Sequence, residues 1–392
     1  MNSAITSTTR LARALVIGVS TAAFLTGTVA SAQTVETVAP RAILIEYSTG
    51  QVLFAKNADE PAPPASMSKM MLLYLLFEQL AEGKLTMEDT FPVSEKAWRM
   101  GGSKMFVRVD TRVSVRDLLR GIIVQSGNDA CIVVAEGLSG TEAAFAARMT
   151  ERGKDLGLRN SVFQNATGWP AEGDVMSTRD LATLAMRLIR DFPQYYEIFS
   201  ERTFTYNNIP QPNRNPLLFS YPGTDGLKTG HTEEAGYGLT ASAVKNGRRL
   251  VLVAAGMTSE SQRAKETERL MDWGFREFGN FEFFKPGEVV AEAPVWLGNK
   301  DTVPLVLEGG LTVTMSRTAR RQMTVKAVFD GPIPAGIKRG QQVATLRIEA
   351  PDMEPIVRPL YAATDVDRLG LVGRLGTAVN HLVWGPAAPA AN

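Results

Sequence analysis

Two consecutive prolines followed by a long run of helix formers are the feature that most constrains how this chain can fold. Pro63 and Pro64 favour an extended backbone and disfavour helix before them. The residues after them favour helix without interruption until Gly83, which is a typical helix stop. The pattern predicts that a helix begins at or near Ser66 and that Lys69, three residues later, lies on the same face.

The surroundings of Ser66 and Lys69 suit an activated nucleophile. A hydroxyl at a helix start lies near free N–H groups and the positive end of the helix dipole, which favour developing negative charge. Met and Leu flank Lys69, so desolvation should lower its pKa, and a neutral lysine can activate a serine without histidine. A Ser-x-x-Lys pair also arises by chance. Ser242 and Lys245 form one in a predicted strand, where residues three apart point to opposite faces.

The amino terminus has the pattern of a secretory signal. Arg10 and Arg13 precede an apolar run over residues 14–25, and small residues follow at 30–32. A transmembrane helix would need a longer apolar run. We therefore expect residues 1–32 to be a signal peptide and the mature protein to be exported.

Composition argues against several classes of function. The chain has 42 Lys and Arg against 41 Asp and Glu, without a basic block, so no nucleic-acid partner is predicted. Its one cysteine, Cys131, lies in an apolar run and is expected to be a buried, inert thiol. One cysteine and two histidines make a protein zinc site improbable, so no metal or cofactor is predicted. The G-x-S-x-G motif of α/β-hydrolases is absent from the sequence.

Residues 33–284 are predicted to form the main domain. A hairpin is expected over residues 41–55, and a second over residues 237–255, where an Asn-Gly pair joins two apolar strands. A helix over residues 262–278 should close this domain.

Capping patterns predict the other helices. Ser114 and Ser177 each precede an acidic residue by three positions and then an apolar run, as in a capping box. Asn128 or Asp129 is expected to cap the helix that follows them, and residues 141–156 should form another helix.

Residues 285–364 are predicted to form a small all-β domain, because short alternating segments follow one another between turn residues. No cluster of titratable groups stands out there, so we expect a spacer or a partner-binding domain. The predicted strands cover residues 289–296, 303–307, 311–315, 323–329, 343–348 and 356–361.

Residues 365–392 are predicted to form an amphipathic tail with a disordered end. One helical face would carry apolar residues, and three glycines weaken the helix. Two interpretations stay open: a frayed end or a helix packed on its own domain, and an interfacial membrane helix. The apolar face consists of Leu371, Val372, Leu375, Val379 and Leu382.

Three short motifs stand in one order along the chain, and the first two can carry out the covalent chemistry of acyl transfer. They are Ser66-x-x-Lys69, Ser126-Gly127-Asn128 and Lys228-Thr229-Gly230. Ser66 would attack a carbonyl while neutral Lys69 accepts its proton. Ser126 would relay that proton toward the leaving amine, and Asn128 would hold the substrate amide or the position of Lys69.

The third motif suits recognition of an extended peptide. Lys228 and Thr229 would offer a cation and a hydroxyl to a substrate carboxylate. Gly230 would let the substrate backbone pass close to a strand edge, which favours β-addition of a peptide.

These motifs, with Ser-Gly-Asn in the middle position, resemble those of the low-molecular-mass penicillin-binding proteins that are D-alanyl-D-alanine carboxypeptidases. The similarity extends to residues 213–215, 225–227 and 270–275, and to the β-rich second part and amphipathic end. It covers nearly the whole mature chain.

The resemblance implies an α/β (α+β) fold of the penicillin-recognising serine transpeptidase and β-lactamase type, with a mixed antiparallel sheet flanked by helices and a small all-β C-terminal domain. It implies a periplasmic serine peptidase that removes the terminal D-alanine from peptidoglycan stem pentapeptides and is acylated by penicillins. The backbone N–H groups of Ser66 and His231 would form the oxyanion hole, and Arg263 would lie near the substrate carboxylate. The tail would then touch the outer face of the inner membrane.

Several alternatives remain open from the sequence. A class A β-lactamase would need a glutamate in a Glu-x-x-Leu-Asn context, which the sequence lacks. A transpeptidase shares the first half-reaction, and an endopeptidase that cuts cross-links is a closer rival. The non-enzyme alternative is a catalytically inactive cell-wall-binding scaffold of the same fold.

Overall fold

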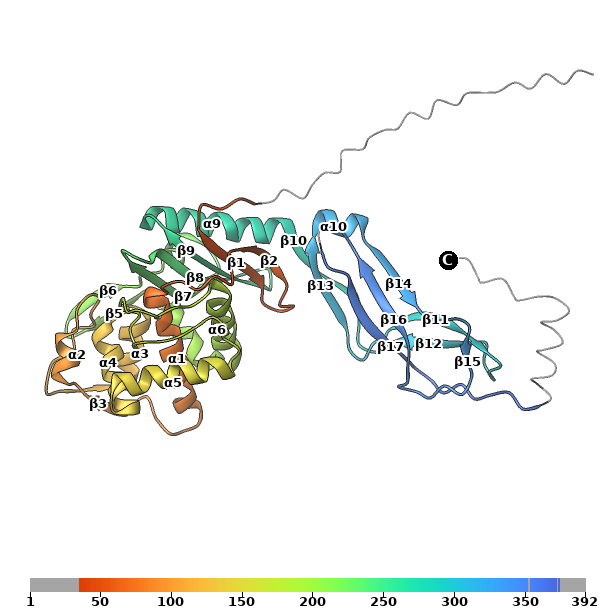
Figure 1. Cartoon of the computed structure of the whole chain (residues 1–392), viewed down its shortest axis with the longest axis horizontal. Helices are drawn as coiled ribbons and strands as arrows, with labels where there is room; N and C mark the ends of the chain where they lie inside the picture. The colour runs from red at the N-terminus through yellow and green to blue at the C-terminus, as the bar shows by residue number, and fades with distance from the viewer. Residues whose placement is uncertain (1–34, 352, 372, 374–392) are drawn as a thin grey trace, which may run out of the picture. The chain divides into compact units, whose positions relative to one another are not determined.

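The computed structural model describes residues 35–351, 353–371 and 373. The predicted signal peptide and most of the predicted tail lie outside the described residues. Helices and an antiparallel sheet come first along the chain, and short strands follow (Figure 1).

Five antiparallel strands form the sheet that positions the site. They are β1 (Arg41–Glu46), β2 (Val52–Lys56), β7 (Thr224–Thr232), β8 (Gly236–Lys245) and β9 (Arg248–Met257). Their order is β2-β1-β9-β8-β7, so β7 is an edge strand. Both predicted hairpins are present, and the Asn-Gly pair between β8 and β9 has the positive φ angles of 51° and 76° that a tight hairpin turn needs.

Helices surround this sheet and build most of the main domain. The predicted helices are present with bounds shifted by a few residues at most, and α2 and α7 add short turns. The bounds are α1 (Lys69–Ala81), α2 (Glu95–Arg99), α3 (Val115–Ile123), α4 (Asn128–Ser139), α5 (Glu142–Asp155), α6 (Thr178–Asp191), α7 (Pro193–Tyr196) and α9 (Glu260–Glu277), with the short strands β3 (Thr90–Pro92) and β4 (Arg112–Ser114) pairing between α1 and α3.

The sheet separates two apolar layers because its side chains alternate. Ile43 and Val253 belong to the large core that contains α1, whereas Leu44 and Leu252 belong to a second core that contains residues of α9. At Gly274 of α9 an added Cβ would lie 2.6 Å from Leu44, so this glycine allows the helix to approach the sheet closely.

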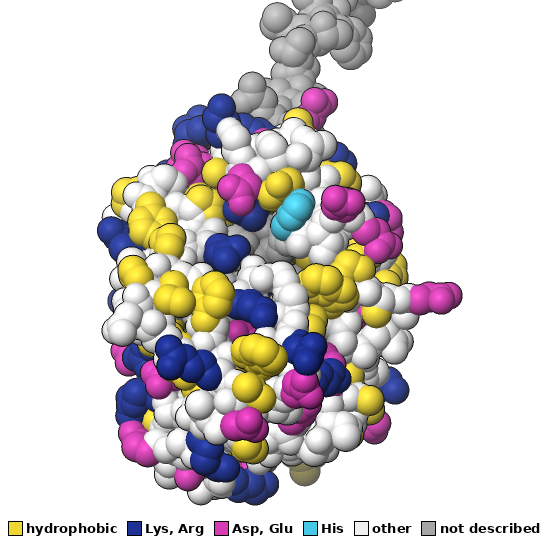
Figure 2. All heavy atoms as spheres, turned by 90° about the vertical axis from the view of Figure 1, so that its left-hand side faces the viewer, with side chains coloured by type: hydrophobic (Ala, Val, Ile, Leu, Met, Phe, Trp, Pro, Cys, Tyr) yellow, Lys and Arg dark blue, Asp and Glu magenta, His cyan; other side chains and the backbone are white. Residues whose placement is uncertain are grey.

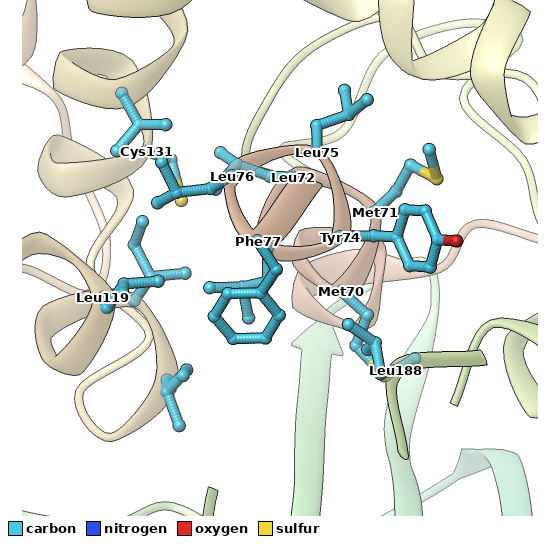
Figure 3. Close-up of a cluster of buried hydrophobic side chains, with 14 of the residues drawn as sticks. Met70, Met71, Leu72, Tyr74, Leu75, Leu76, Phe77, Leu119, Cys131 and Leu188 are labelled. Atoms are coloured by element: carbon cyan, nitrogen blue, oxygen red, sulfur yellow. The ribbon is translucent and has the colours of Figure 1, made fainter. Parts of the chain in front are cut away.

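Helix α1 lies at the centre of the large core. Figure 3 shows Leu119 of α3, Cys131 of α4 and Leu188 of α6 around it. Nearly all residues of α1 are buried, which explains why its sequence is apolar on every side. Burial raises the pKa of the Cys131 thiol to about 12, in keeping with the expected inert thiol.

The predicted N-caps Ser114 and Ser177 are confirmed, but the prediction that Asn128 or Asp129 caps α4 is wrong. Each serine Oγ accepts a hydrogen bond of 3.1 Å from the N–H three residues later. At α4 the N-cap is Gly127, without a side-chain cap. Asp129 instead turns its carboxylate toward the N–H groups of residues 105–107, which competes with capping its own helix.

The sequence reading missed a hairpin between α6 and the sheet. Strands β5 (Thr203–Tyr206) and β6 (Ile209–Pro212) pair across Asn207 and Asn208, both at positive φ. Two asparagines are typical of such a turn. The prolines in β6, however, are more typical of an irregular connection than of a strand. The 3-10 helix η2 (Glu197–Ser200) and helix α8 (Leu217–Ser220) flank this hairpin.

The side chains of the second Ser-x-x-Lys pair lie in different surroundings, as its place in a strand predicts. Ser242 is fully buried in β8 and its Oγ accepts a hydrogen bond of 2.5 Å from Arg249. The Lys245 ammonium lies 3.6 Å from the centre of the Tyr221 ring. The two side chains thus have separate partners.

Beyond α9 the described residues form a β-rich part with its own apolar core. The predicted strands are present there, and β10, β15 and the short helix α10 were not foreseen. One sheet has the order β14-β16-β17-β12-β11-β15, and β10 pairs with β13. The bounds are β10 (Phe278–Phe284), β11 (Val289–Trp296), β12 (Thr302–Val306), β13 (Leu311–Ser316), α10 (Arg317–Gln322), β14 (Thr324–Val328), β15 (Ile333–Pro334), β16 (Gln342–Glu349) and β17 (Ile356–Ala362).

No single helix among the described residues combines the length and the apolar character of a membrane span; α4 and α5 meet that test only as a pair bent by 81°.

Candidate active site

Ser66 and Lys69 come together at the start of the buried helix. Ser66 lies in the 3-10 helix η1 (Ala65–Ser68), which runs directly into α1 at Lys69. The Lys69 Nζ is 2.6 Å from the Ser66 Oγ, and the lysine is fully buried. Ala65 has a φ of 49°, an unfavourable backbone conformation for a residue with a Cβ. The site therefore holds Ser66 in a strained turn. The Lys69 nitrogen beside it, whether ammonium or amine, is shielded from bulk water.

The second partner of Lys69 fits the neutral amine as well as the ammonium form. Its Nζ donates a hydrogen bond of 2.5 Å to the carbonyl of Thr167, which can only accept. A neutral amine can make this bond and still offer its lone pair to the Ser66 hydroxyl. Burial, the largest cause, lowers the pKa of Lys69 to about 8. Lys69 can therefore be neutral near physiological pH, as a general base requires.

Ser126 and Lys228 form a second hydroxyl–lysine pair. Lys228 is in edge strand β7, and its Nζ donates hydrogen bonds of 2.9 Å to the Ser126 Oγ and 3.2 Å to the Thr229 carbonyl. Burial first, and then the nearby Lys69, lower the pKa of Lys228 well below its ordinary value. A bound carboxylate would favour its charged form. Ser126 has a φ of 59°, so strain marks this turn as well.

Asn128 is fixed against a glycine-rich loop. Its Nδ2 donates a hydrogen bond of 2.9 Å to the Gly101 carbonyl, and its backbone N–H donates one of 2.7 Å to the Ser103 carbonyl. The Asp129 carboxylate holds the next residues of that loop through backbone N–H groups. The amide is thus placed beside the site by two elements.

Edge strand β7 passes close to the serine turn. A Cβ on Gly230 would lie 2.9 Å from the Pro64 carbonyl oxygen and 3.2 Å from the Ala65 Cβ. Only a glycine permits this approach without a shift of backbone. Because of this approach, the backbone around Ser66 faces the backbone around His231. The His231 side chain is exposed and stacks on Tyr237, with ring centres 3.8 Å apart.

Arg263 is a buried cation without a close anion among the described residues. Its side chain is 7% exposed, and the carboxylate of exposed Glu260 lies 3.9 Å from its Nη2. The Arg263 Nε is buried without a hydrogen-bond partner. Arg263 also lies in the first turn of α9, where the helix dipole disfavours positive charge. These features are typical of an arginine that binds an anionic ligand.

A fourth cation, Arg214, belongs to the same group. Its charge lowers the pKa of Lys69, Lys228 and Arg263 alike, although burial is the larger cause in each. Figure 2 shows a hollow beside the histidine, with lysine and arginine side chains on its rim. That histidine is His231, because His381 lies outside the described residues. The site is therefore positively charged around a cleft.

Sequence reasoning missed three parts of this site. Arg214 occurs within a motif that resembles the family, but no role was assigned to it. The Thr167 carbonyl carries no side-chain signal at all. Asn165 was missed too: its Oδ1 accepts hydrogen bonds from Thr167, Gly168 and Trp169, which shapes the loop that presents that carbonyl. A lone asparagine in a loop has many ordinary explanations.

Asp174 anchors the other end of this loop and should make stability depend on pH. It is 4% exposed and accepts a hydrogen bond of 3.0 Å from the Gln164 N–H. Burial is the largest cause that raises its pKa from 3.8 to about 6. A raised acid contributes full stability below its unfolded pKa and loses it as pH rises through about 6.

Asp174→Asn removes this titration but keeps an oxygen that can accept from Gln164. Relative to the wild type, the free energy of unfolding of the variant should therefore increase by about 2–3 kcal/mol between pH 4 and pH 7.5. Urea unfolding at both pH values measures the difference. A wild type that gains stability over the variant as pH rises would contradict the assigned cause.

Comparisons with known proteins agree with this geometry. The family described as D-alanyl-D-alanine carboxypeptidase matches residues 27–259, and the family described as penicillin-binding protein 5, C-terminal domain, matches residues 278–368. D-alanyl-D-alanine carboxypeptidase DacC of Escherichia coli is 38% identical over 357 residues, which cover 88% of this chain and 89% of that protein. DacF of Bacillus subtilis is 33% identical over 85% of this chain and 87% of its own length.

Solved structures show the same fold. Penicillin-binding protein 5 from Haemophilus influenzae superposes with a TM-score of 0.75 at 34% identity, over 86% of this chain and all of that chain (100%). Penicillin-binding protein D2 from Listeria monocytogenes, in its ampicillin-bound form, has a TM-score of 0.57 at 31% identity and covers 62% of this chain and 99% of its own. The predicted fold class is confirmed.

Proposed function

Since the chain belongs to the D-alanyl-D-alanine carboxypeptidase family, we propose that it removes the terminal D-alanine from peptidoglycan stem pentapeptides through an acyl-enzyme on Ser66. The single observation that carries this proposal is the contact of 2.6 Å between the Ser66 Oγ and the buried Lys69 Nζ. The relatives' names supply the substrate class, and the cation-lined cleft suits a peptide with a free carboxylate.

In the first step, the Ser66 Oγ attacks the carbonyl carbon of the penultimate D-alanine. The neutral Lys69 amine accepts the hydroxyl proton as the new C–O bond forms. The backbone N–H groups of Ser66 and His231, on the facing segments, stabilise the oxyanion. Ammonium formation at Lys69 is supported by the Thr167 carbonyl, which accepts one of its protons.

The tetrahedral intermediate then expels the terminal D-alanine. Its C–N bond breaks, and the leaving nitrogen needs a proton. Ser126 donates that proton and is resupplied by Lys228, whose Nζ is 2.9 Å away. Asn128 holds the amide of the acyl part. Lys69 then passes the proton that it took from Ser66 to the deprotonated Lys228, so both lysines return to their starting forms. Water attacks the ester, Lys69 accepts the water proton, and this proton goes to the Ser66 Oγ as the ester C–O bond breaks.

A β-lactam fits the same sequence of steps. Its strained amide is the scissile bond, and its carboxylate takes the place of the peptide terminus. The ring-opened amine stays attached to the acyl group, so it hinders the approach of water. We therefore expect penicillins to form a long-lived ester with Ser66.

Recognition of the free carboxylate separates a carboxypeptidase from an endopeptidase. Lys228, Thr229 and Arg263 are proposed to bind it through charge-assisted hydrogen bonds. A neutral replacement would leave the buried Arg263 without an anion. Replacing the terminal acid of an N-acylated D-Ala-D-Ala peptide by its amide should therefore lower kcat/KM by roughly a hundredfold or more.

Thr229→Val and Arg263→Ala test this account. Each substitution should lower the ratio of kcat/KM for the acid to kcat/KM for the amide, mainly because the acid reacts more slowly. Removal of Arg263 is not expected to unfold the protein, because the site holds a buried cation without a close anion. Measurement of D-alanine and D-alanine amide release by the three enzymes decides. Equal rates on acid and amide would favour the endopeptidase that cuts within cross-links.

We also propose a periplasmic location, supported by the secretory pattern of residues 1–32 and by the wall substrate. Contact of the tail with the outer face of the inner membrane is a finer proposal, supported by the apolar stripe in its sequence. Deletion of residues 370–392, which spares the buried Val366 and the bridge of Arg368 to Gly298, should then abolish vesicle binding and leave turnover of a small peptide unchanged. Equal binding by both forms would overturn the anchor.

A further inference from the structure

Trp169 is an exposed aromatic residue beside the site that the catalytic steps do not use. Its side chain is 46% exposed, and it follows the Thr167 carbonyl by two residues. A large apolar ring at the surface can gain free energy by packing on a partner or a ligand. Its position next to the reacting groups makes the second explanation worth testing.

The loop that carries Trp169 is held rigidly. Asn165 accepts a hydrogen bond of 3.1 Å from the Trp169 N–H and donates one of 2.9 Å to its carbonyl. Gly168 precedes it with a φ of 72°, and an added Cβ there would lie 1.9 Å from the Ala65 carbonyl oxygen. The loop therefore presses against the turn that carries Ser66, and the backbone of Trp169 is held in place relative to the nucleophile.

The ring lies on the Asn128 side of the site. A Cβ on Gly102 would be 2.8 Å from Trp169 Cζ3 and 2.8 Å from the Asn128 Nδ2, so ring and amide are neighbours. Arg263 belongs to another element, α9. A substrate whose acyl amide meets Asn128 therefore has its acyl part near the Trp169 ring.

We propose that Trp169 is a specificity-determining residue that contacts the side chain of the residue before D-Ala-D-Ala and selects for a long aliphatic one. This inference rests on the proposed function. The flat ring offers apolar area to several methylenes, and the loop backbone is already fixed, so binding does not have to order it. A side chain with an ammonium end would add a cation–π contact.

The test compares two peptides and two β-lactams. The peptides are Nα,Nε-diacetyl-L-lysyl-D-alanyl-D-alanine and Nα-acetyl-glycyl-D-alanyl-D-alanine, which differ only in that side chain. The β-lactams are benzylpenicillin and 6-acetamidopenicillanic acid, which keep the same amide and differ only in the phenyl group of the acyl side chain. Trp169→Ala should lower kcat/KM for the lysyl peptide and the acylation rate by benzylpenicillin about tenfold, and change the two smaller compounds less than twofold.

Trp169→Phe keeps a ring and should retain most of the preference. Phe219→Ala is the matched control, because Phe219 is 52% exposed and packs under Arg202 on α8. It should change none of the four rates. Thermal unfolding of each variant shows whether the loop still folds.

An equal loss on large and small compounds would overturn the inference, because Trp169 would then only support the loop. The same holds if Trp169→Ala leaves the preference for the lysyl peptide intact. A wild type that releases D-alanine from neither peptide would instead contradict the proposed function, so the two failures are distinct.

Discussion

Lys69→Arg should lower the rate of acylation about a thousandfold or more, although it keeps the positive charge. A guanidinium stays protonated at any pH the protein tolerates and cannot accept the Ser66 proton. The wild-type rate should rise with pH through about 8 and then level off, because Lys69 becomes neutral above its pKa. The variant should lack this rise. Stopped-flow acylation by a chromogenic β-lactam between pH 6 and pH 10 measures both effects.

Lys245→Arg provides a matched control for this substitution. Lys245 occupies the same place in the second Ser-x-x-Lys pair but contacts the Tyr221 ring, where a guanidinium can stack as well. Its rate and pH profile should match the wild type. A Lys69→Arg enzyme with near-wild-type acylation would show that Lys69 has a structural role and that another group accepts the proton.

Ser126→Ala should slow D-alanine release by about a hundredfold or more while preserving the fold. The serine Oγ is the acceptor for the Lys228 Nζ and the only hydroxyl proposed to protonate the leaving nitrogen. Loss of a general acid costs about two to four orders of magnitude in rate. The backbone at this position has the same positive φ for serine and alanine, so strain in the folded protein changes little.

A second substrate distinguishes proton transfer by Ser126 from a role in which Ser126 only positions other groups. A peptide analogue with a leaving group of low pKa, such as a thioester, needs no proton on departure and should lose much less rate. Ser242→Ala, which removes the buried serine of strand β8, should affect neither substrate. Equal loss on amide and thioester would mean that Ser126 only orders the site.

The sequence anticipated the reacting side chains because each of them sits on an element with a strong local pattern. Two prolines before an apolar run place Ser66 and Lys69, and an Asn-Gly hairpin places the strands next to Lys228. The structure brings both pairs into contact, at 2.6 Å and 2.9 Å. The contact between Lys228 and Ser126 was not foreseen, since they are 102 residues apart and no local pattern encodes it.

Other parts of the site depend on backbone or tertiary geometry, so sequence pattern could not predict them. The Thr167 carbonyl is recruited by a turn around Asn165, and a carbonyl is present at every residue. Asp129 resembled a helix cap but binds loop N–H groups instead, because the packed loop offers it three donors. Tertiary contacts overrode the local preference in both cases.

The β-rich part was predictable in its strands but not in its role. Alternation of apolar residues encodes the strands, as at Leu346 and Ile348 of β16, both buried in its core. The order of those strands depends on pairings between distant segments. The short helix α10 interrupts this pattern after Ser316, which caps the helix through its Oγ. The sequence pattern did not predict α10 because it has only six residues.

The most direct test of the central assignment is peptide mapping by mass spectrometry after a brief exposure of the protein to benzylpenicillin. The account predicts a single penicilloyl ester on Ser66, lasting minutes and absent from Ser66→Ala. A label on Ser242, or no label while the drug stays intact, would contradict the assignment of Ser66 as the nucleophile of this enzyme.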